Sequence, residues 1–144
     1  MSRRDRMGEA EEIFEILVTS FAQRGGMAPA DAELCWRPAT DAYETEDSFV
    51  VQMDLAGLDP GRIEVLADTR SLLVRGIRSD TSVPGKKHFH EMEISVGPFA
   101  RRVPLNVAVD PGSARAVYRG GFLYVTFRKG SGDRPGGRQI AIDR

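Results

Sequence analysis

The sequence predicts an all-β protein built as an antiparallel β-sandwich, with an amphipathic helical arm before it and a flexible tail after it. Three observations support this fold class. Apolar and polar residues alternate with a period of two in short runs between residues 40 and 129. Clusters of Gly, Pro, Asp and Ser separate these runs, and no helical pattern interrupts them. We therefore divide the chain into a helical arm and linker (residues 1–39), a β-sandwich domain (40–129) and a tail (130–144).

Length, charge and cysteine content limit the possible functions. A chain of 144 residues is long enough for one domain with a hydrophobic core, but too short for two ordinary domains. Its 20 Lys and Arg residues nearly balance its 21 Asp and Glu residues, so no strong net field attracts nucleic acid or an acidic membrane. The single cysteine cannot form a disulfide within the chain, and the first apolar stretch is too short and too charged for a signal peptide. We expect a cytoplasmic protein.

The N-terminal arm carries the pattern of an amphipathic helix. Its apolar residues follow the i, i+3, i+4, i+7 spacing of one helical face. They are Ala10, Ile13, Phe14, Leu17, Val18 and Phe21. Glutamates lie on the opposite face, and Gly25-Gly26 end the helix after about four turns. The apolar face packs either on the chain's own sandwich or on another surface.

The strand pattern begins in the run SFVVQMDL, where Phe49, Val51, Met53 and Leu55 point to one face. Six further runs have strand composition: RIEVLAD, SLLVRGI, HFHEMEI, FARRVPL, ARAVY and FLYVTFR. A Gly-Gly pair between the last two suits the positive φ of a tight hairpin. This spacing predicts about seven or eight short strands, as in a two-sheet sandwich.

The tail ends in two isoleucines, Ile140 and Ile142, after a Gly- and Pro-rich tether from Gly130 to Arg138. Because side chains alternate along an extended chain, both isoleucines lie on one side of a short strand. Such a strand can add to the edge of a sheet. An extended tether of this length spans at most about 30 Å, which reaches either the chain's own sandwich or a neighbour's.

Four short motifs occur in order along the chain. They are DLAGLDPGRIEV, GPFARRVPLN, ARAVYRGGFL and the terminal Ile140-Ala141-Ile142. In this order and strand context they resemble the small heat-shock protein family, which is built on the immunoglobulin-like α-crystallin domain, in its bacterial, archaeal and plant form. The resemblance runs from Pro38 to the end, and the chain departs from the family's motifs at Ala56, Asn106 and Phe122.

The resemblance implies an ATP-independent holdase chaperone, which binds partly unfolded proteins and prevents their aggregation, with no enzymatic activity and no cofactor. It implies a dynamic homo-oligomer with unfolded client proteins and downstream ATP-driven chaperones as partners. It implies no nucleic acid, membrane or small-molecule substrate. On the N-terminal helix, the expected client-binding residues are Ile13, Phe14, Leu17, Val18 and Phe21.

The resemblance also implies two contacts between subunits. The tail isoleucines would dock in a groove of a neighbouring subunit, lined by Ile63, Val65, Ala116 and Tyr118. The HFHEMEI run would swap into a partner to form a dimer, with an interface of Phe89, His90, Glu91, Glu93 and Arg101. A partly buried Arg101 guanidinium needs a carboxylate, from Glu91 or Glu93. The alternatives are a frayed or self-docked tail and an exposed arginine on a sheet face.

Other chemistries have weaker support. His88 and His90 project to the same side of a strand, but two histidines without a third ligand favour a surface or interface pair over a metal site. Cys35 has no clear base or orienting partner that would make it a nucleophile. The run GSGDRPG lacks the spacing of a phosphate-binding loop. The main alternative is a monomeric cochaperone similar to the CS domain, or another protein-binding module, against which the apolar helix and the terminal isoleucines argue.

Overall fold

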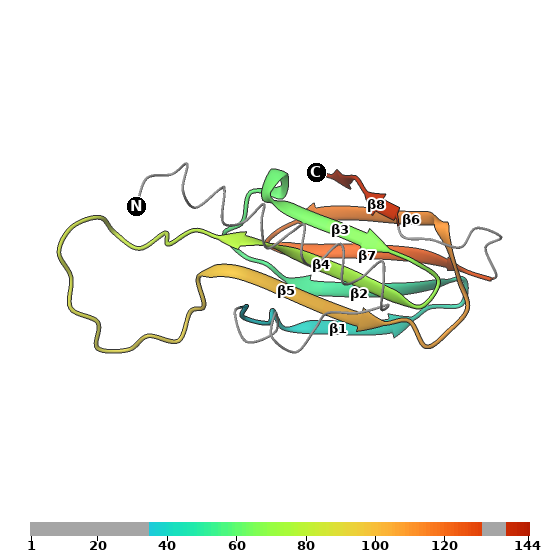
Figure 1. The fold of residues 1–144 in the computed structure, drawn as a ribbon, viewed down its shortest axis with the longest axis horizontal. Helices are drawn as coiled ribbons and strands as arrows, with labels where there is room; N and C mark the ends of the chain where they lie inside the picture. The colour runs from blue at the N-terminus through green and yellow to red at the C-terminus, as the bar shows by residue number, and fades with distance from the viewer. Residues whose placement is uncertain (1–34, 131–137) are drawn as a thin grey trace.

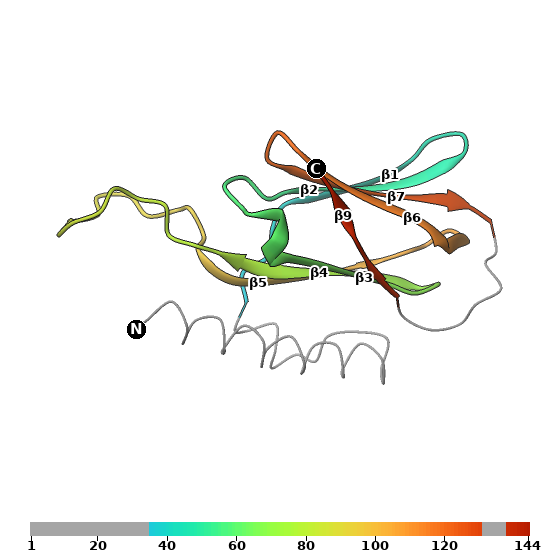
Figure 2. The same ribbon diagram turned by 90° about the horizontal axis from the view of Figure 1, so that it is seen from above.

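The structure, a computed structural model, describes residues 35–130 and 138–144, which form two β-sheets packed face to face (Figures 1 and 2). The first sheet contains, in spatial order, β1 (Thr40–Glu44), β2 (Ser48–Asp54), β7 (Phe122–Lys129), β6 (Val109–Arg119) and β9 (Ile142–Asp143). The second contains β5 (Gly97–Pro104), β4 (Ser71–Arg78), β3 (Ile63–Ala67) and β8 (Arg138–Ile140). A 3₁₀ turn, η1 (Pro60–Arg62), precedes β3. The predicted all-β sandwich is confirmed, while the predicted helical arm lies outside the described residues.

Turn residues fix the register of neighbouring strands. Gly120 and Gly121, with φ of 60° and 86°, connect β6 to β7 in a tight hairpin, as predicted. Between β3 and β4, Asp68 Oδ1 accepts hydrogen bonds from the backbone N–H groups of Arg70 and Ser71, at 2.7 and 2.8 Å. Because a slip of one residue would turn every side chain to the other face, these turns decide which residues enter the core.

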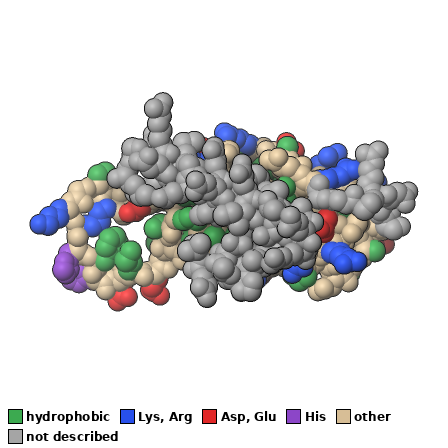
Figure 3. All heavy atoms as spheres, in the orientation of Figure 1, with side chains coloured by type: hydrophobic (Ala, Val, Ile, Leu, Met, Phe, Trp, Pro, Cys, Tyr) green, Lys and Arg blue, Asp and Glu red, His purple; other side chains and the backbone are tan. Residues whose placement is uncertain are grey.

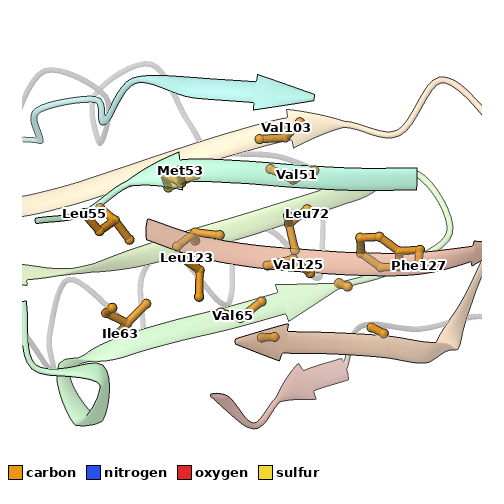
Figure 4. Close-up of a cluster of buried hydrophobic side chains, with 14 of the residues drawn as sticks. Val51, Met53, Leu55, Ile63, Val65, Leu72, Val103, Leu123, Val125 and Phe127 are labelled. Carbon is orange, nitrogen blue, oxygen red and sulfur yellow. The ribbon is translucent and has the colours of Figure 1, made fainter. Parts of the chain in front are cut away.

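The core lies between the two sheets and follows the period of two. Ten of its side chains are labelled in Figure 4: Val51, Met53, Leu55, Ile63, Val65, Leu72, Val103, Leu123, Val125 and Phe127. Each fully buried side chain of this kind contributes about 1.5–3 kcal/mol. Gly76 on β4 leaves room for its neighbours, since a Cβ there would lie 2.9 Å from Phe99 Cζ and would clash with the Arg62 carbonyl oxygen.

β1 was not predicted. It pairs with β2 along its whole length and forms the outer edge of the first sheet. Four of its five residues are exposed, so the run carries no alternation of buried and exposed positions. An edge strand of this kind shows no hydrophobic period in its sequence.

The HFHEMEI run, residues 88–94, was predicted as a strand, and this prediction is wrong for the single chain. These residues belong to a loop, residues 79–96, that projects from the ends of β4 and β5 (Figure 1). We name it the projecting loop. The physical reason is pairing: no described strand of the chain pairs with this run, and an unpaired strand leaves its N–H and C=O groups without partners.

Candidate functional site

The residues predicted to line the tail-docking groove lie on two strands that face each other across the sandwich. Ile63 and Val65 belong to β3 in the second sheet, and Ala116 and Tyr118 belong to β6 in the first. We call this place the β3–β6 seam. Ile63, Val65 and Ala116 are buried in the core, and the half-buried Tyr118 packs against it. Tyr118 Oη donates a hydrogen bond to the Leu55 carbonyl oxygen at 2.9 Å, which holds the ring in place.

The chain's own tail covers the β3–β6 seam. β8 pairs antiparallel with β3, where Ile140 lies opposite Val65, and β9 pairs parallel with β6, where Ile142 lies opposite Ala116. Both isoleucines are half-buried and pack against the core. In this single chain the self-docked tail, one of the two alternatives, is the arrangement observed. Docking on a neighbouring subunit stays a prediction.

The tail divides its two isoleucines between the sheets. The sequence predicted one short strand that carries both isoleucines to one sheet edge. Instead, the extended pairing breaks at Ala141, because the tail passes from the edge of one sheet to the edge of the other (Figure 2). Each sheet therefore receives one short strand and one isoleucine, and the tail links the two sheets at the β3–β6 seam.

Few contacts hold the tail in place. Three of its residues pair with β3 and two with β6. Arg144 Nη2 lies 3.6 Å from Asp59 Oδ1, but both side chains are exposed, and an ion pair of this kind contributes about 0–1 kcal/mol. The tail is thus held by its five paired residues and by the packing of Ile140 and Ile142 against the core.

Most of the predicted dimer-interface residues lie on the projecting loop and are exposed to solvent. Phe89, His90, Glu91 and Glu93 are all exposed. Three apolar side chains of the same loop are exposed still further, with Val83 at 82%, Met92 at 72% and Ile94 at 79%. Figure 3 shows hydrophobic, acidic and histidine side chains gathered on the loop. Exposed apolar side chains grouped in this way mark an interaction surface.

Arg101 lies away from the glutamates that were predicted to pair with it. It belongs to β5, and its Nη1 donates a hydrogen bond to the Pro38 carbonyl oxygen at 3.1 Å. Its Nε is buried without a hydrogen bond, and among residues 35–130 and 138–144 no carboxylate forms a salt bridge with it. Burial lowers the pKa of Arg101, and the nearby Arg37 lowers it further. The single chain therefore does not assemble the predicted pair, because both glutamates remain on the projecting loop.

The structure contains a partly buried ion pair that was not predicted. Arg75 Nη2 on β4 lies 3.0 Å from Glu64 Oε2 on β3, and the Arg75 side chain is buried. Burial lowers the pKa of Arg75 to about 10, while Glu64 and Cys35 act in the opposite direction. The arginine that ends the apolar run SLLVR, with a glutamate in the neighbouring strand, was the available indication.

His88 and His90, for which a surface or interface pair was expected, lie on the projecting loop. The rings of His88 and His90 lie edge to face, with centroids 6.1 Å apart, and both residues are exposed. Within the described ranges, no three His, Cys, Asp or Glu side chains are grouped so that they could hold a metal ion. Nor does this part of the chain contain a helix long and apolar enough to cross a membrane.

Comparison with known proteins decides the family. The model of the Hsp20/alpha crystallin family matches residues 41–143, which include the sandwich and the tail isoleucines. The chain belongs to the Hsp20/alpha crystallin family. The resemblance of the four motifs to small heat-shock proteins is thereby confirmed, and membership of this family supports a chaperone role.

Individual relatives and a solved structure show how far the similarity extends. The chain is 31% identical to the 16.9 kDa class I heat shock protein 3 of Oryza sativa, over 90% of this chain and 84% of the relative. It is 31% identical to spore protein SP21 of Stigmatella aurantiaca, over 72% of this chain. The chain spans 62% of the length of SP21 and 60% of that of small heat shock protein C2 of Rickettsia felis. The solved structure of hspA from Xanthomonas axonopodis matches with a TM-score of 0.59 at 35% identity, over 70% of this chain and 97% of that one.

Proposed function

We propose that this chain is an ATP-independent holdase that acts as a dynamic homo-oligomer. The observation that carries the proposal is the exposed apolar surface of the projecting loop, on a domain in which no described strand pairs with the outer edge of β1. A monomer that left both in water would tend to aggregate. In a member of this chaperone family, association between subunits covers these surfaces and keeps the protein soluble.

The proposed dimer contact pairs a segment of the projecting loop with the outer edge of β1, neither of which has a strand partner among the described residues. Residues 88–94 have strand composition, but no described strand pairs with them, and none pairs with the outer edge of β1. The run from one subunit therefore pairs with β1 of the other. Arg101 is bonded to Pro38, which lies just before β1, so this pairing brings the partner subunit's Glu91 or Glu93 toward the unbonded Nε of Arg101.

The tail supplies the second contact. The β3–β6 seam that the tail covers in its own chain offers the same two strand edges in every other subunit. Because two half-buried isoleucines hold the tail, it leaves its own seam and enters a neighbour's at modest cost. Exchange of tails links dimers into larger particles and makes them dynamic.

Client capture is assigned to the N-terminal helix. Its expected contact residues, Ile13, Phe14, Leu17, Val18 and Phe21, lie outside the described residues, so this assignment rests on the sequence pattern. Partly unfolded proteins expose apolar side chains, and a helix with one apolar face offers a complementary surface. Captured clients then pass to ATP-driven chaperones, as the family resemblance implies.

Light scattering from a heat-denatured or reduced model client tests the proposal. The full chain should suppress client aggregation equally with and without ATP. Replacing the five helix residues by Ser should remove most of this protection, whereas the matched control with Glu11→Gln and Glu15→Gln on the polar face should keep it. Client aggregation that is the same with and without the wild-type chain would overturn the holdase proposal.

A monomeric cochaperone remains the second candidate. The observation that favours it is the tail, which satisfies the β3–β6 seam within one chain and so leaves no need for a neighbour there. Gel filtration separates the two candidates, because the holdase elutes as a large particle at micromolar concentration and the cochaperone as a monomer. A monomer that also leaves the client unprotected favours the cochaperone.

A further inference from the structure

The run Asp-Pro-Gly occurs twice in the chain, at residues 59–61 and 110–112, and both copies form the same kind of turn. Asp59 Oδ1 accepts a hydrogen bond from the Gly61 backbone N–H at 3.0 Å, and Asp110 Oδ1 accepts one from the Gly112 backbone N–H at 2.9 Å. A turn of this kind holds the carboxylate against the backbone, so its position is defined. We call Asp59 and Asp110 the seam aspartates.

The seam aspartates lie at opposite ends of the β3–β6 seam. Asp59 is the N-cap of η1, which leads directly into β3, so it lies where β3 begins. Asp110 lies near the start of β6, before Ala116 and Val117, which pair with the tail. Because β8 runs antiparallel to β3 and β9 runs parallel to β6, the tail begins near the start of β6 and ends near the start of β3. The tail therefore extends from one seam aspartate to the other.

The described part of the tail has an arginine at each end, and each arginine approaches a seam aspartate. Arg144 Nη2 lies 3.6 Å from Asp59 Oδ1. At the other end, a Cβ on Gly112 would lie 3.3 Å from Arg138 Nη1 and 3.2 Å from Asp110 Oδ1. The guanidinium and the carboxylate thus approach each other over Gly112, where the lack of a side chain leaves room for both.

The spacing of the tail residues matches the seam. Arg138, Ile140, Ile142 and Arg144 follow one another at intervals of two residues. Along β8, Arg138 and Ile140 therefore point to the same side, and both are half-buried, while Gln139 between them is exposed. The tail presents a cation, two isoleucines and a cation in the order in which the seam presents a carboxylate, two apolar contacts and a carboxylate.

We propose that Asp59 and Asp110 are specificity residues of the β3–β6 seam. They select an extended segment that carries a cation two residues before and two residues after a pair of isoleucines. The occupant with this chemistry is the tail, either of the same chain or of a second copy, and the second case rests on the proposed function. The same seam would discriminate against an isoleucine pair flanked by carboxylates, because like charges would then face each other at both ends.

Specificity and affinity are divided between different side chains in this arrangement. Exposed ion pairs are weak, so the seam aspartates add little to the strength of docking, which the isoleucines and the paired backbone supply. They decide instead which segment is accepted. Because an isoleucine pair alone is a short and common pattern, a charge requirement at each end narrows the set of segments that the seam binds.

Hydrogen exchange at the tail amides of full-length variants tests the proposal. Asp59→Asn with Asp110→Asn removes both negative charges but keeps the side-chain oxygens that accept from the turn N–H groups. Arg138→Gln with Arg144→Gln removes both positive charges of the tail. A fourfold variant combines the four changes. Exchange at residues 139–142 reports how often the tail leaves the seam.

Two further variants separate charge from structure. Arg138→Lys with Arg144→Lys keeps both positive charges on side chains of different shape. Asp80→Asn is the matched control for the loss of a turn aspartate, because Asp80 Oδ1 accepts from the Ser82 backbone N–H at 2.9 Å on the projecting loop, away from the seam.

The proposal expects each double variant that loses charge to exchange its tail amides about three- to tenfold faster than the wild-type chain at low salt. The fourfold variant should exchange no faster than either double variant, because its second pair of changes removes charges whose partners are already gone. The lysine variant and Asp80→Asn should stay within about twofold of wild type. At about 1 M salt all the proteins should exchange alike, since screening removes the attraction.

Several results would overturn the proposal. Wild-type exchange rates in either double variant at low salt would show that the charges do not act on the tail. Effects that simply add in the fourfold variant would show that the two pairs of charges do not act on each other. A difference that persists at high salt, or a lysine variant as fast as the glutamine variant, would assign these residues a structural role only.

Particle size and client protection, measured on the same samples by light scattering, keep this proposal apart from the proposed function. The expected exchange pattern in a chain that stays monomeric or protects no client would support the seam aspartates and overturn the holdase. Unchanged exchange in variants of a chain that forms large, protective particles would do the reverse. If both proposals hold, the two double variants should form smaller particles than the wild-type chain at low salt, and the lysine variant should not.

Discussion

Arg75 and Glu64 carry opposite charges 3.0 Å apart on the paired strands β4 and β3, and burial disfavours the charged form of both. Burial lowers the pKa of Arg75 to about 10, and it raises the pKa of Glu64 although Arg75 acts to lower it. Desolvation thus exceeds the mutual attraction for each partner. We infer that the pair adds little net stability, as is common for desolvated ion pairs, while the loss of one partner removes the attraction that offsets the desolvation of the other.

A pair of variants tests this inference. Glu64→Leu with Arg75→Met should leave the free energy of unfolding unchanged or raise it by up to about 1–4 kcal/mol, because no charge is buried. Glu64→Leu alone should lower it by about 1–3 kcal/mol, since the guanidinium then loses its oppositely charged partner. Urea denaturation measures both. A double variant less stable than the single one would contradict the inference.

The dependence of the free energy of unfolding on pH provides a control for these two variants. Because the pKa of Glu64 is higher in the folded state than its ordinary value of 4.5, the folded chain binds this proton more tightly than the unfolded chain. The contribution of Glu64 to stability therefore grows as pH falls through the window just above 4.5, and is lost as pH rises through it. Glu64→Leu should remove this slope. An unchanged slope between pH 4 and pH 6 would assign it to other carboxylates.

An element can be predicted from the sequence when its own residues carry the pattern of its surroundings, and it is missed when distant contacts decide its structure. β2 and β7 were predicted because Met53 and Val125 alternate with more exposed residues along strands that have a core face. β1 was missed because an exposed edge strand needs no apolar pattern. Residues 88–94 have strand composition, but no described strand of the chain pairs with them. The residues of the β3–β6 seam were predicted from the motifs, yet the division of Ile140 and Ile142 between two sheets depends on tertiary packing that no local pattern encodes.

The projecting loop gives a prediction at the scale of an element. The double variant Met92→Glu, Ile94→Glu should weaken the affinity of the proposed dimer by about two decades or more, since each buried apolar side chain contributes about 1.5–3 kcal/mol. Both side chains are exposed in the single chain, so circular dichroism should show an unchanged β-sandwich. Val83→Glu is the matched control, because Val83 is exposed on the same loop but lies outside residues 88–94. Sedimentation velocity that shows the same dimer fraction in all three proteins would remove the loop from the interface.

At the scale of the whole molecule, the proposed oligomer would offer the tail two seams with the same contacts, that of its own chain and that of a neighbour. Its own β3–β6 seam is always within reach of the tether, at an effective concentration in the millimolar range, whereas a neighbour's seam in solution is present at the concentration of the protein. In dilute solution, each tail should therefore stay docked on the β3–β6 seam of its own chain. Within a dimer or a larger particle the neighbouring seams are also close, and many weak tail contacts then act together. Particle size should accordingly rise with protein concentration.

Replacing both tail isoleucines tests whether the tail connects subunits. Ile140 and Ile142 are half-buried, so the pair contributes about 3 kcal/mol to each tail contact, which corresponds to about two decades in affinity. The double variant Ile140→Ala, Ile142→Ala should keep the sandwich and the loop-mediated dimer, yet form a much smaller particle in light scattering at micromolar concentration. Gln139→Ala is the matched control, since Gln139 is exposed on the same strand. An unchanged particle size in the double variant would show that the tail serves only its own chain, and a lost β signal in circular dichroism would show that the two isoleucines are part of the core that holds the two sheets together.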